Sequence, residues 1–138
     1  MQAFIGLGQI DKLDNICKRR NENFNIYQQE LSSFSPSIIE RGFVSNFAYP
    51  VISENRDLIV KALQKENIEV RPMICGSMGT QPFYVKEFGR KELSNASIID
   101  KNGFYVPNHP GLKKENILKI TNIINSNNNF IDPYLQTR

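Results

Sequence analysis

The residues best suited to bind a ligand lie between Arg71 and Leu112. Two short apolar runs there end in loops rich in glycine and proline, and arginine, serine, glutamine, asparagine and histidine side chains lie close by. Small residues let the backbone approach a polar ligand closely, so these loops are candidates for a binding site. The same composition is typical of ordinary turns at sheet edges. Local chemistry leaves both interpretations open with equal weight.

His109, the single histidine of the chain, is the candidate for acid–base chemistry, because the charge of a histidine changes near neutral pH. A general base needs an orienting partner and a nucleophile nearby, and the sequence contains no recognisable triad. A turn residue packed against a proline is therefore the favoured interpretation of His109. Arg71 could hold a phosphate or carboxylate through two hydrogen bonds, or it could be a solvated strand end. The segment Gly76–Gly79 lacks the spacing of a phosphate loop. We predict no catalytic residue and no metal site.

The size and composition indicate one soluble domain. The chain has 138 residues, of which 40% are hydrophobic and 22% charged. It contains neither a long apolar run nor a secretory leader, so we expect no membrane association. Cys17 and Cys75 match no metal or redox spacing and are predicted to be reduced thiols in a cytoplasmic protein. The net charge of +3 is mild and dispersed, which argues against a nucleic-acid partner.

The apolar periodicity predicts alternating helices and strands. A long helix should span residues 1–34 and end at Ser35-Pro36-Ser37, because apolar residues recur there at three- and four-residue steps. Its stripe is Phe4, Leu7, Ile10, Leu13, Cys17, Phe24, Tyr27 and Leu31. The domain could not cover this whole stripe, so we expect part of it to pack on something outside the chain. A polar tail should follow, at residues 126–138.

The remaining elements are shorter. Pro50 places the first strand at a sheet edge, Ser53 is expected to cap the second helix, Asn67 to adopt a left-handed conformation, and Gly103 to end the third helix. The predicted ranges are strand 43–52, helix 53–63, strand 68–74, helix 93–100, strand 104–106 and a last helix after Pro110-Gly111. This order predicts an α+β two-layer sandwich, with a small, mostly antiparallel three-stranded sheet and helices on one face.

Several motifs in this order resemble a known family. They are Met1–Asp14 with Arg19-Arg20-Asn21, then Ile68–Pro72, then Gly103–Leu112. They are similar to the C-terminal small domain of the DegT/DnrJ/StrS family of pyridoxal-phosphate-dependent sugar aminotransferases. The match covers residues 1–125. Residues 71–99 also resemble the GDP-4-keto-6-deoxymannose 3-dehydratase branch. Family members are much longer, and their Schiff-base lysine lies in a larger N-terminal domain that nothing here resembles.

The resemblance implies a fragment of an enzyme with the small-domain fold of fold-type-I transferases. The full-length enzyme would use pyridoxal or pyridoxamine 5'-phosphate on a nucleotide-linked keto-deoxysugar, by transamination or 3-dehydration, in surface-polysaccharide or deoxysugar biosynthesis. This chain alone should be inactive and bind no cofactor. Gln2 and Phe4 would lie where the helix leaves the large domain, and its start would help to build a homodimer. The positions placed nearest the substrate are Arg71, Ser77, Gln81, Asn108 and His109.

Two other classes of function compete with this one. The chain could be a stand-alone ligand-binding or regulatory α+β module that uses the same polar loops. A nucleic-acid binder is suggested only by the isoelectric point of about 8.9. That function needs a basic-aromatic sheet surface, whereas the strand aromatics are more simply interpreted as core. These are Phe43, Phe47, Tyr49, Phe104 and Tyr105.

Overall fold

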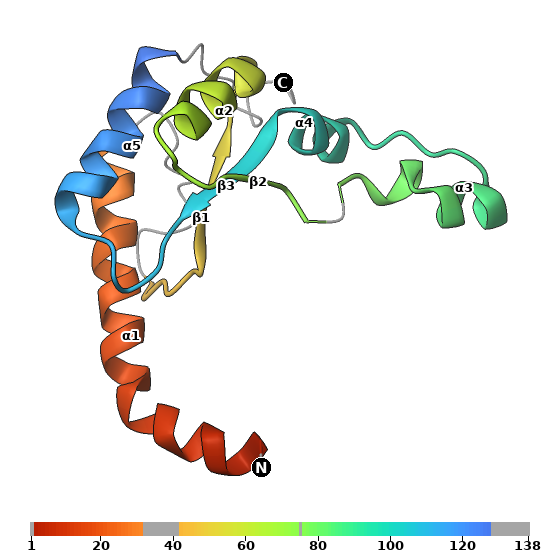
Figure 1. Cartoon of the computed structure of the whole chain (residues 1–138). Helices are drawn as coiled ribbons and strands as arrows, with labels where there is room; N and C mark the ends of the chain where they lie inside the picture. The colour runs from red at the N-terminus through yellow and green to blue at the C-terminus, as the bar shows by residue number, and fades with distance from the viewer. Residues whose placement is uncertain (1, 32–41, 75, 128–138) are drawn as a thin grey trace.

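A sheet of three antiparallel strands is the centre of the computed structural model, which describes residues 2–31, 42–74 and 76–127. The strand order is β1-β3-β2 (Figure 1). In chain order the elements are α1 (Gln2–Glu30), β1 (Ala48–Ile52), α2 (Arg56–Lys65), β2 (Arg71–Pro72), the 3-10 turn η3 (Met78–Thr80), α3 (Pro82–Phe88), α4 (Ser94–Asn102), β3 (Gly103–Pro107) and α5 (Lys114–Ser126).

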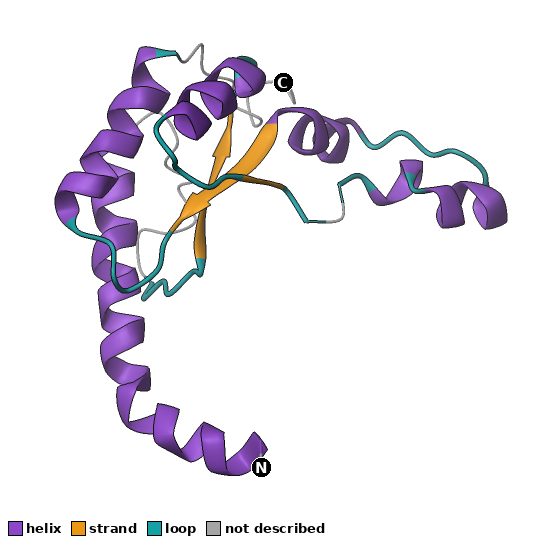
Figure 2. Cartoon of the chain, viewed as in Figure 1, coloured by secondary structure: helices purple, strands orange, loops and turns teal. Residues whose placement is uncertain are grey.

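One face of the sheet is covered and the other is open. Tyr49 lies opposite Val106, and Val51 opposite Phe104, so these four side chains share a face. All four are buried, and they pack against a layer that contains the second half of α1 and the helices α2 and α5 (Figure 2). The predicted α+β sandwich with helices on one face is therefore confirmed. The core consists of Phe24, Tyr27, Leu31, Tyr49, Val51, Ile59, Leu63, Phe104, Val106, Leu112, Ile117, Ile120 and Ile124.

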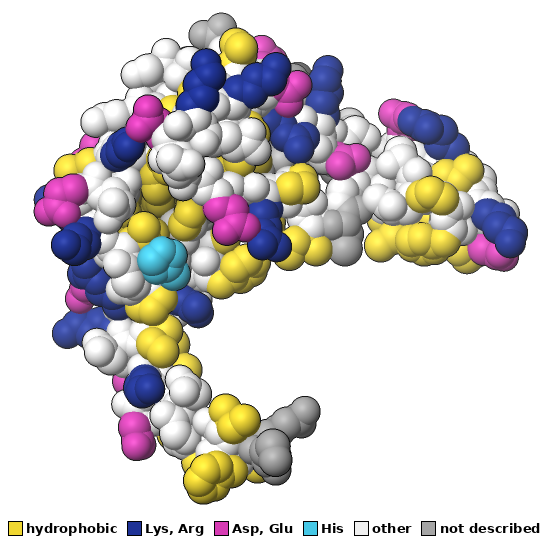
Figure 3. Space-filling model, in the orientation of Figure 1, with side chains coloured by type: hydrophobic (Ala, Val, Ile, Leu, Met, Phe, Trp, Pro, Cys, Tyr) yellow, Lys and Arg dark blue, Asp and Glu magenta, His cyan; other side chains and the backbone are white. Residues whose placement is uncertain are grey.

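The long helix divides into two parts. From about Asn23 onward α1 packs on the core, whereas every residue from Ala3 to Asn15 is exposed. The first part projects from the body of the molecule, as does the segment around α3 (Figure 1). Apolar side chains gather on the inner side of the curve between these two projections (Figure 3). The predicted stripe is thus covered only in its second half, as expected for a surface that packs on something outside the chain.

The segment that carries η3 and α3 is held at its base by close backbone contacts. The Lys91 N–H donates to the Gly79 carbonyl at 3.0 Å, and a Cβ on Gly79 would collide with the Lys91 carbonyl. Gly76 has a φ of +54° beneath the carboxylate of Asp100, a conformation that favours glycine. None of the residues of α3 is buried. This projection therefore keeps its position through its base and not through a core of its own.

Several boundaries differ from the prediction. The second strand is only Arg71–Pro72, since Pro72 has no N–H to extend the ladder. The first strand begins at Ala48, five residues later than predicted. Helix α3 was not predicted, although a proline at its first position is a start signal. Asn55, not Ser53, occupies the N-cap position of α2; Ser53 Oγ instead accepts the Asn55 N–H at 3.2 Å.

Other local expectations are confirmed. Asn67 is left-handed, with a φ of 57°, and Gly103 is the C-cap of α4. Pro50 lies in β1, which is an edge strand. The predicted helix stop at residues 35–37 and most of the predicted polar tail lie outside the described residues. Across the described ranges, no helix has both the length and the apolar character needed to cross a bilayer.

Two stacked tyrosines join α1 to the sheet. The rings of Tyr27 and Tyr49 lie 4.7 Å apart at 19°, and Tyr27 Oη donates to the Pro107 carbonyl at 2.8 Å. Gln28 Nε2 donates to Tyr49 Oη at 3.0 Å. Burial raises the pKa of both hydroxyls well above the usual value, and the neighbouring Tyr49 adds to the rise in the pKa of Tyr27. Both tyrosines are therefore held in the neutral form.

Alkaline pH should destabilise the fold through this pair. The folded chain holds the two protons more tightly than the unfolded chain, so the stabilisation is complete below about pH 10 and is lost as pH rises above it. We expect the free energy of unfolding to fall by about 1.4 kcal/mol per pH unit for each tyrosine above that point. Urea unfolding at a series of pH values measures the slope. Tyr27→Phe should reduce it, and an unchanged slope would contradict this account.

Candidate functional site

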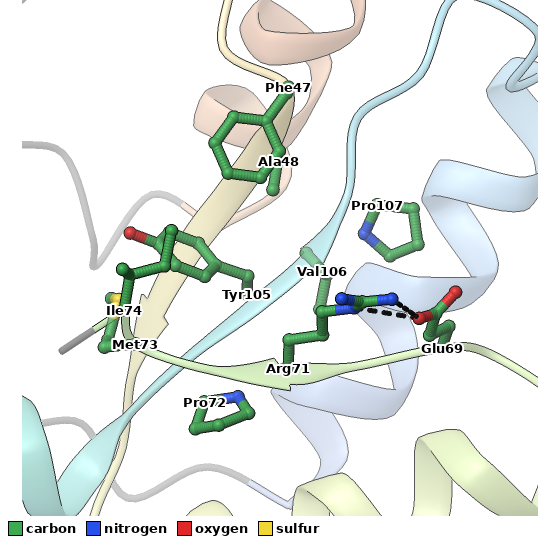
Figure 4. A pocket seen from close by; sticks show the side chains of 10 residues that line it. All are labelled: Phe47, Ala48, Glu69, Arg71, Pro72, Met73, Ile74, Tyr105, Val106 and Pro107. Atoms are coloured by element: carbon green, nitrogen blue, oxygen red, sulfur yellow. Dashed lines mark hydrogen bonds and ion pairs between the residues drawn. The ribbon is translucent and has the colours of Figure 1, made fainter. Parts of the chain in front are cut away.

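A groove of about 550 Å³ lies on the open face of the sheet (Figure 4). Strands β1, β2 and β3 form its floor, and the segments next to β1 and β2 form its walls. Its volume is within the range of about 300–1,000 Å³ that is usual for small-molecule sites. The residues that line it are Phe47, Ala48, Glu69, Arg71, Pro72, Met73, Ile74, Tyr105, Val106 and Pro107.

Strand pairing places a cation beside an aromatic ring in this groove. Arg71 of β2 lies directly opposite Tyr105 of β3. Directly opposite residues of antiparallel strands project from the same face, with Cβ atoms about 5 Å apart. Phe104, the neighbour of Tyr105 in β3, is buried on the covered face, whereas Pro72 is exposed and also lines the groove. The predicted ligand-binding Arg71 therefore lies on the open face because of the register.

The guanidinium of Arg71 is held by a neighbouring carboxylate. Arg71 Nε and Nη2 donate to Glu69 Oε1 at 2.9 and 2.7 Å (Figure 4). The two side chains are 77% and 71% exposed, so solvent screens the pair and it adds little to stability. The carboxylate of Glu69 therefore orients the guanidinium.

An aromatic pair forms the other wall of the groove. The rings of Phe47 and Tyr105 lie 5.9 Å apart at 49°. Phe47 is 62% exposed and Tyr105 half-buried, so the prediction that they belong to the core is wrong. Phe43 is also exposed. The alternation of strands explains the error for Tyr105, because its neighbour Phe104 occupies the covered face and successive side chains point to opposite faces.

His109 lies in the turn after β3, outside the groove. Its side chain is exposed, and its Nδ1 accepts the Gly111 N–H at 3.2 Å. Its carbonyl accepts the Leu112 N–H at 3.1 Å and the Asn23 Nδ2 at 3.1 Å. These bonds make His109 a turn residue fixed to α1, in agreement with the interpretation favoured from the sequence.

Asn108 is fully buried, so its role in the described structure is to join segments. Its Nδ2 donates to the Arg20 carbonyl of α1 at 3.3 Å and to the Asn46 carbonyl before β1 at 2.9 Å. Its Oδ1 is also buried. The amide therefore connects three parts of the chain: α1, the entry to β1 and the exit from β3. This placement makes Asn108 a positioning residue for the His109 turn.

Ser77 and Gln81 lie at the projecting segment. Ser77 directly precedes η3 and is buried, and its carbonyl accepts the Thr80 hydroxyl at 2.9 Å. Gln81 directly precedes Pro82, the first residue of α3, and its side chain is half-buried. Of the five predicted site residues, all of them described, only Arg71 lines the groove. Phe47, Tyr105 and Glu69 line it and were not predicted, because their proximity depends on the register of three strands.

The residues of the groove do not by themselves fit a pyridoxal phosphate site. Its lining contains no lysine, and Arg71 is its single basic side chain. A pyridoxal cofactor needs a lysine partner for its aldehyde. Within the described ranges there is also no group of three or more histidine, cysteine or acidic side chains that could hold a metal. The groove thus combines one guanidinium and one carboxylate with an aromatic and aliphatic lining.

These features define an α+β domain with a groove on the open face of its sheet. Comparison with known proteins identifies the class further. The sequence profile of the DegT/DnrJ/EryC1/StrS aminotransferase family matches residues 1–125. The chain belongs to this family.

Three relatives illustrate the similarity. The lipopolysaccharide biosynthesis protein RfbH of Salmonella typhimurium is 30% identical over 129 residues, which cover 85% of this chain and 30% of RfbH. A GDP-4-keto-6-deoxymannose-3-dehydratase with a trapped PLP-glutamate geminal diamine has a TM-score of 0.69 at 26% identity, over 86% of this chain and 33% of that one. A mutant dehydratase with bound GDP-perosamine has a TM-score of 0.72 at 25% identity, with the same coverage.

The chain spans about a third of the length of the curated relatives that it matches. The similarity therefore concerns one part of those proteins. It confirms the family that the sequence motifs indicated and the predicted α+β fold.

Substitution of Asn108 should destabilise the fold far more than substitution of His109. Asn108→Ala removes the donor to two carbonyls and leaves a cavity, so we expect a loss of about 2 kcal/mol or more. His109→Ala removes one exposed contact, and we expect a loss below about 1 kcal/mol. Urea unfolding measures both. Equal losses would show that the asparagine does not join the segments as described.

Proposed function

We propose that this chain is the C-terminal part of an enzyme that uses pyridoxal or pyridoxamine 5'-phosphate to transform a nucleotide-linked keto-deoxysugar. The reaction would be a transamination or a 3-dehydration, in a cytoplasmic pathway of surface-polysaccharide or deoxysugar biosynthesis. The observation that carries the proposal is the family match over residues 1–125, together with the agreement in fold with dehydratases that hold the cofactor or a GDP-sugar. The groove on the open sheet face is consistent with a contribution to substrate binding.

The chain would bind and orient the substrate, while the cofactor would be held by the part of the family architecture that the chain does not cover. The cofactor would act there as an electron sink. Arg71 would hold an anionic group, and the exposed His109 would contact a ligand at the edge of the sheet. Ser77 and Asn108 are buried and would support these segments from behind. Gln81 would position the start of α3.

Spectroscopy of the cofactor tests the division of roles. The 138-residue chain titrated with pyridoxal phosphate should show no saturable visible band, and reduction with borohydride should label no single lysine preferentially. A longer protein, expressed from the gene together with the coding sequence upstream of Met1, should show a saturable visible band and the labelling of one lysine. It should also turn over GDP-4-keto-6-deoxymannose. Selective labelling of one lysine in the short chain would contradict the proposal. Absence of any cofactor-binding upstream segment would favour a stand-alone ligand-binding module.

The exposed first half of α1 is proposed to mediate a homodimer. Phe4, Leu7, Ile10 and Leu13 are 81%, 64%, 62% and 53% exposed, and apolar side chains so close together rarely remain in water. The double substitution Phe4→Ser with Leu7→Ser should raise the dimer dissociation constant at least about a hundredfold, since burial of each side chain in the interface would contribute about 1.5–3 kcal/mol.

Sedimentation equilibrium measures this dissociation constant. Leu58→Ser is the matched control, because Leu58 is 60% exposed but lies on α2, away from the projecting helix; it should leave the association unchanged. A chain that remains monomeric at high concentration, or a dimer that is insensitive to the α1 substitutions, would contradict a dimer through this helix.

A further inference from the structure

We infer that one ordered water molecule is bound inside the protein, at the junction of α1, the segment before β1 and the turn after β3. The residues that hold it are Arg20, Asn23, Ser45 and Asn108. This internal site is independent of the proposed function and separate from the groove on the open sheet face. The water is a fixed part of the junction that positions the His109 turn on α1.

Four buried polar atoms at this junction have no hydrogen-bond partner in the protein. They are Arg20 Nε, Asn23 Oδ1, Ser45 Oγ and Asn108 Oδ1. Among the described residues, the other side-chain atoms of this kind are the hydroxyls of Ser77, next to η3, and Ser97, in α4. Buried polar groups in proteins are nearly always hydrogen-bonded, either to the protein or to ordered water. Four unpaired atoms in one place therefore indicate a common partner.

The hydrogen bonds of Asn108 bring three of these side chains together. Its Nδ2 donates to the Arg20 carbonyl at 3.3 Å. It also donates to the carbonyl of Asn46 at 2.9 Å, and Asn46 directly follows Ser45. The amide of Asn108 therefore lies between the α1 turn that carries Arg20 and the segment that carries Ser45.

The fourth side chain, Asn23, reaches the same junction from α1. Its Nδ2 donates to the carbonyl of His109 at 3.1 Å, and His109 directly follows the central asparagine of the junction. Arg20 and Asn23 are three positions apart on α1, so their side chains project from the same face of the helix. One further bond, from the Val44 N–H to Asn21 Oδ1 at 2.9 Å, holds the segment before β1 against this part of α1.

The same bonds determine whether each unpaired atom donates or accepts. The Nδ2 atoms of Asn23 and Asn108 face carbonyl oxygens, so neither amide can be turned over without placing oxygen against oxygen. Their Oδ1 atoms are therefore acceptors. Arg20 Nε–H can only donate, and the Ser45 hydroxyl is able to donate. The junction thus offers two acceptors and two donors, and a water molecule offers two donors and two acceptors in return.

The charges at the junction favour a neutral occupant. The two amide oxygens disfavour an anion, and the guanidinium of Arg20 disfavours a cation. Asn23 and Asn108 are both fully buried, so the occupant is enclosed by the protein. Internal waters typically make about three hydrogen bonds, within a range of 2–4, to buried polar groups that are otherwise unsatisfied. The four unpaired atoms meet this requirement.

Crystallography of the 138-residue chain at high resolution tests the site directly. We expect a peak of electron density within about 2.5–3.2 Å of Asn23 Oδ1, Asn108 Oδ1 and Arg20 Nε. A direct hydrogen bond from Arg20 Nε to either amide oxygen, with no peak between them, would overturn the inference. Crystals grown in bromide distinguish water from a halide, because an anomalous signal at the peak would identify an anion and would also overturn it.

NMR of the same chain tests the site in solution. A water that stays bound for longer than the protein takes to tumble gives nuclear Overhauser cross-peaks to nearby side-chain amide protons, and we expect them for Asn23 and Asn108. The double substitution Arg20→Met with Ser45→Ala removes both donors and should abolish these cross-peaks, because two acceptors alone hold a water weakly. Cross-peaks of unchanged intensity in the double variant would contradict the assigned donors.

Two single variants make this measurement specific. Ser45→Ala alone should retain the cross-peaks, because three partners remain. Their loss in this variant would trace the signal to exchange of the Ser45 hydroxyl proton and would overturn the inference. Ser97→Ala is the matched control, since it removes another buried and unpaired serine hydroxyl, on α4 instead of at the junction. It should leave the cross-peaks unchanged, and a loss equal to that of the double variant would show general loosening of the fold and not a defined site.

Discussion

The packing of the second half of α1 against the sheet is the constraint on which the other features depend. The rings of Tyr27 and Tyr49 stack on each other, and the 2.8 Å bond from Tyr27 Oη to the Pro107 carbonyl joins positions 80 residues apart. Asn23 and Asn108 add hydrogen bonds from the same helix to the exit of β3. Because these bonds are buried, removing one partner leaves the other unsatisfied, and the arrangement tolerates little adjustment.

That packing uses one face of the sheet and leaves the other available. An antiparallel sheet can be covered on a single side, and its side chains then alternate between core and exterior. In β3, Phe104 and Val106 complete the core while Tyr105 faces the groove. The same strand thus stabilises the fold and supplies a wall of the candidate site, so the site lies on a rigid element.

The two projections give the molecule its unusual outline. The exposed first half of α1 and the segment with η3 and α3 carry Phe4, Leu7, Phe83 and Phe88, all more than half exposed. Apolar side chains are concentrated on the inner side of the curve that these projections enclose (Figure 3). A chain that spans about a third of its relatives' length would be expected to leave such surface uncovered.

The sequence by itself determined the family, the α+β class, the order of most elements and the local signals at Asn67 and Gly103, because these depend on periodicity, on turn chemistry and on motifs contiguous in the chain. It also singled out Arg71. Tertiary structure alone decided that Asn108 is buried and that Phe47, Glu69 and Tyr105 meet Arg71 in one groove. Which residues become neighbours across β1, β3 and β2 depends on strand register and on the face that α1 covers. Both are set by contacts between residues distant in the sequence.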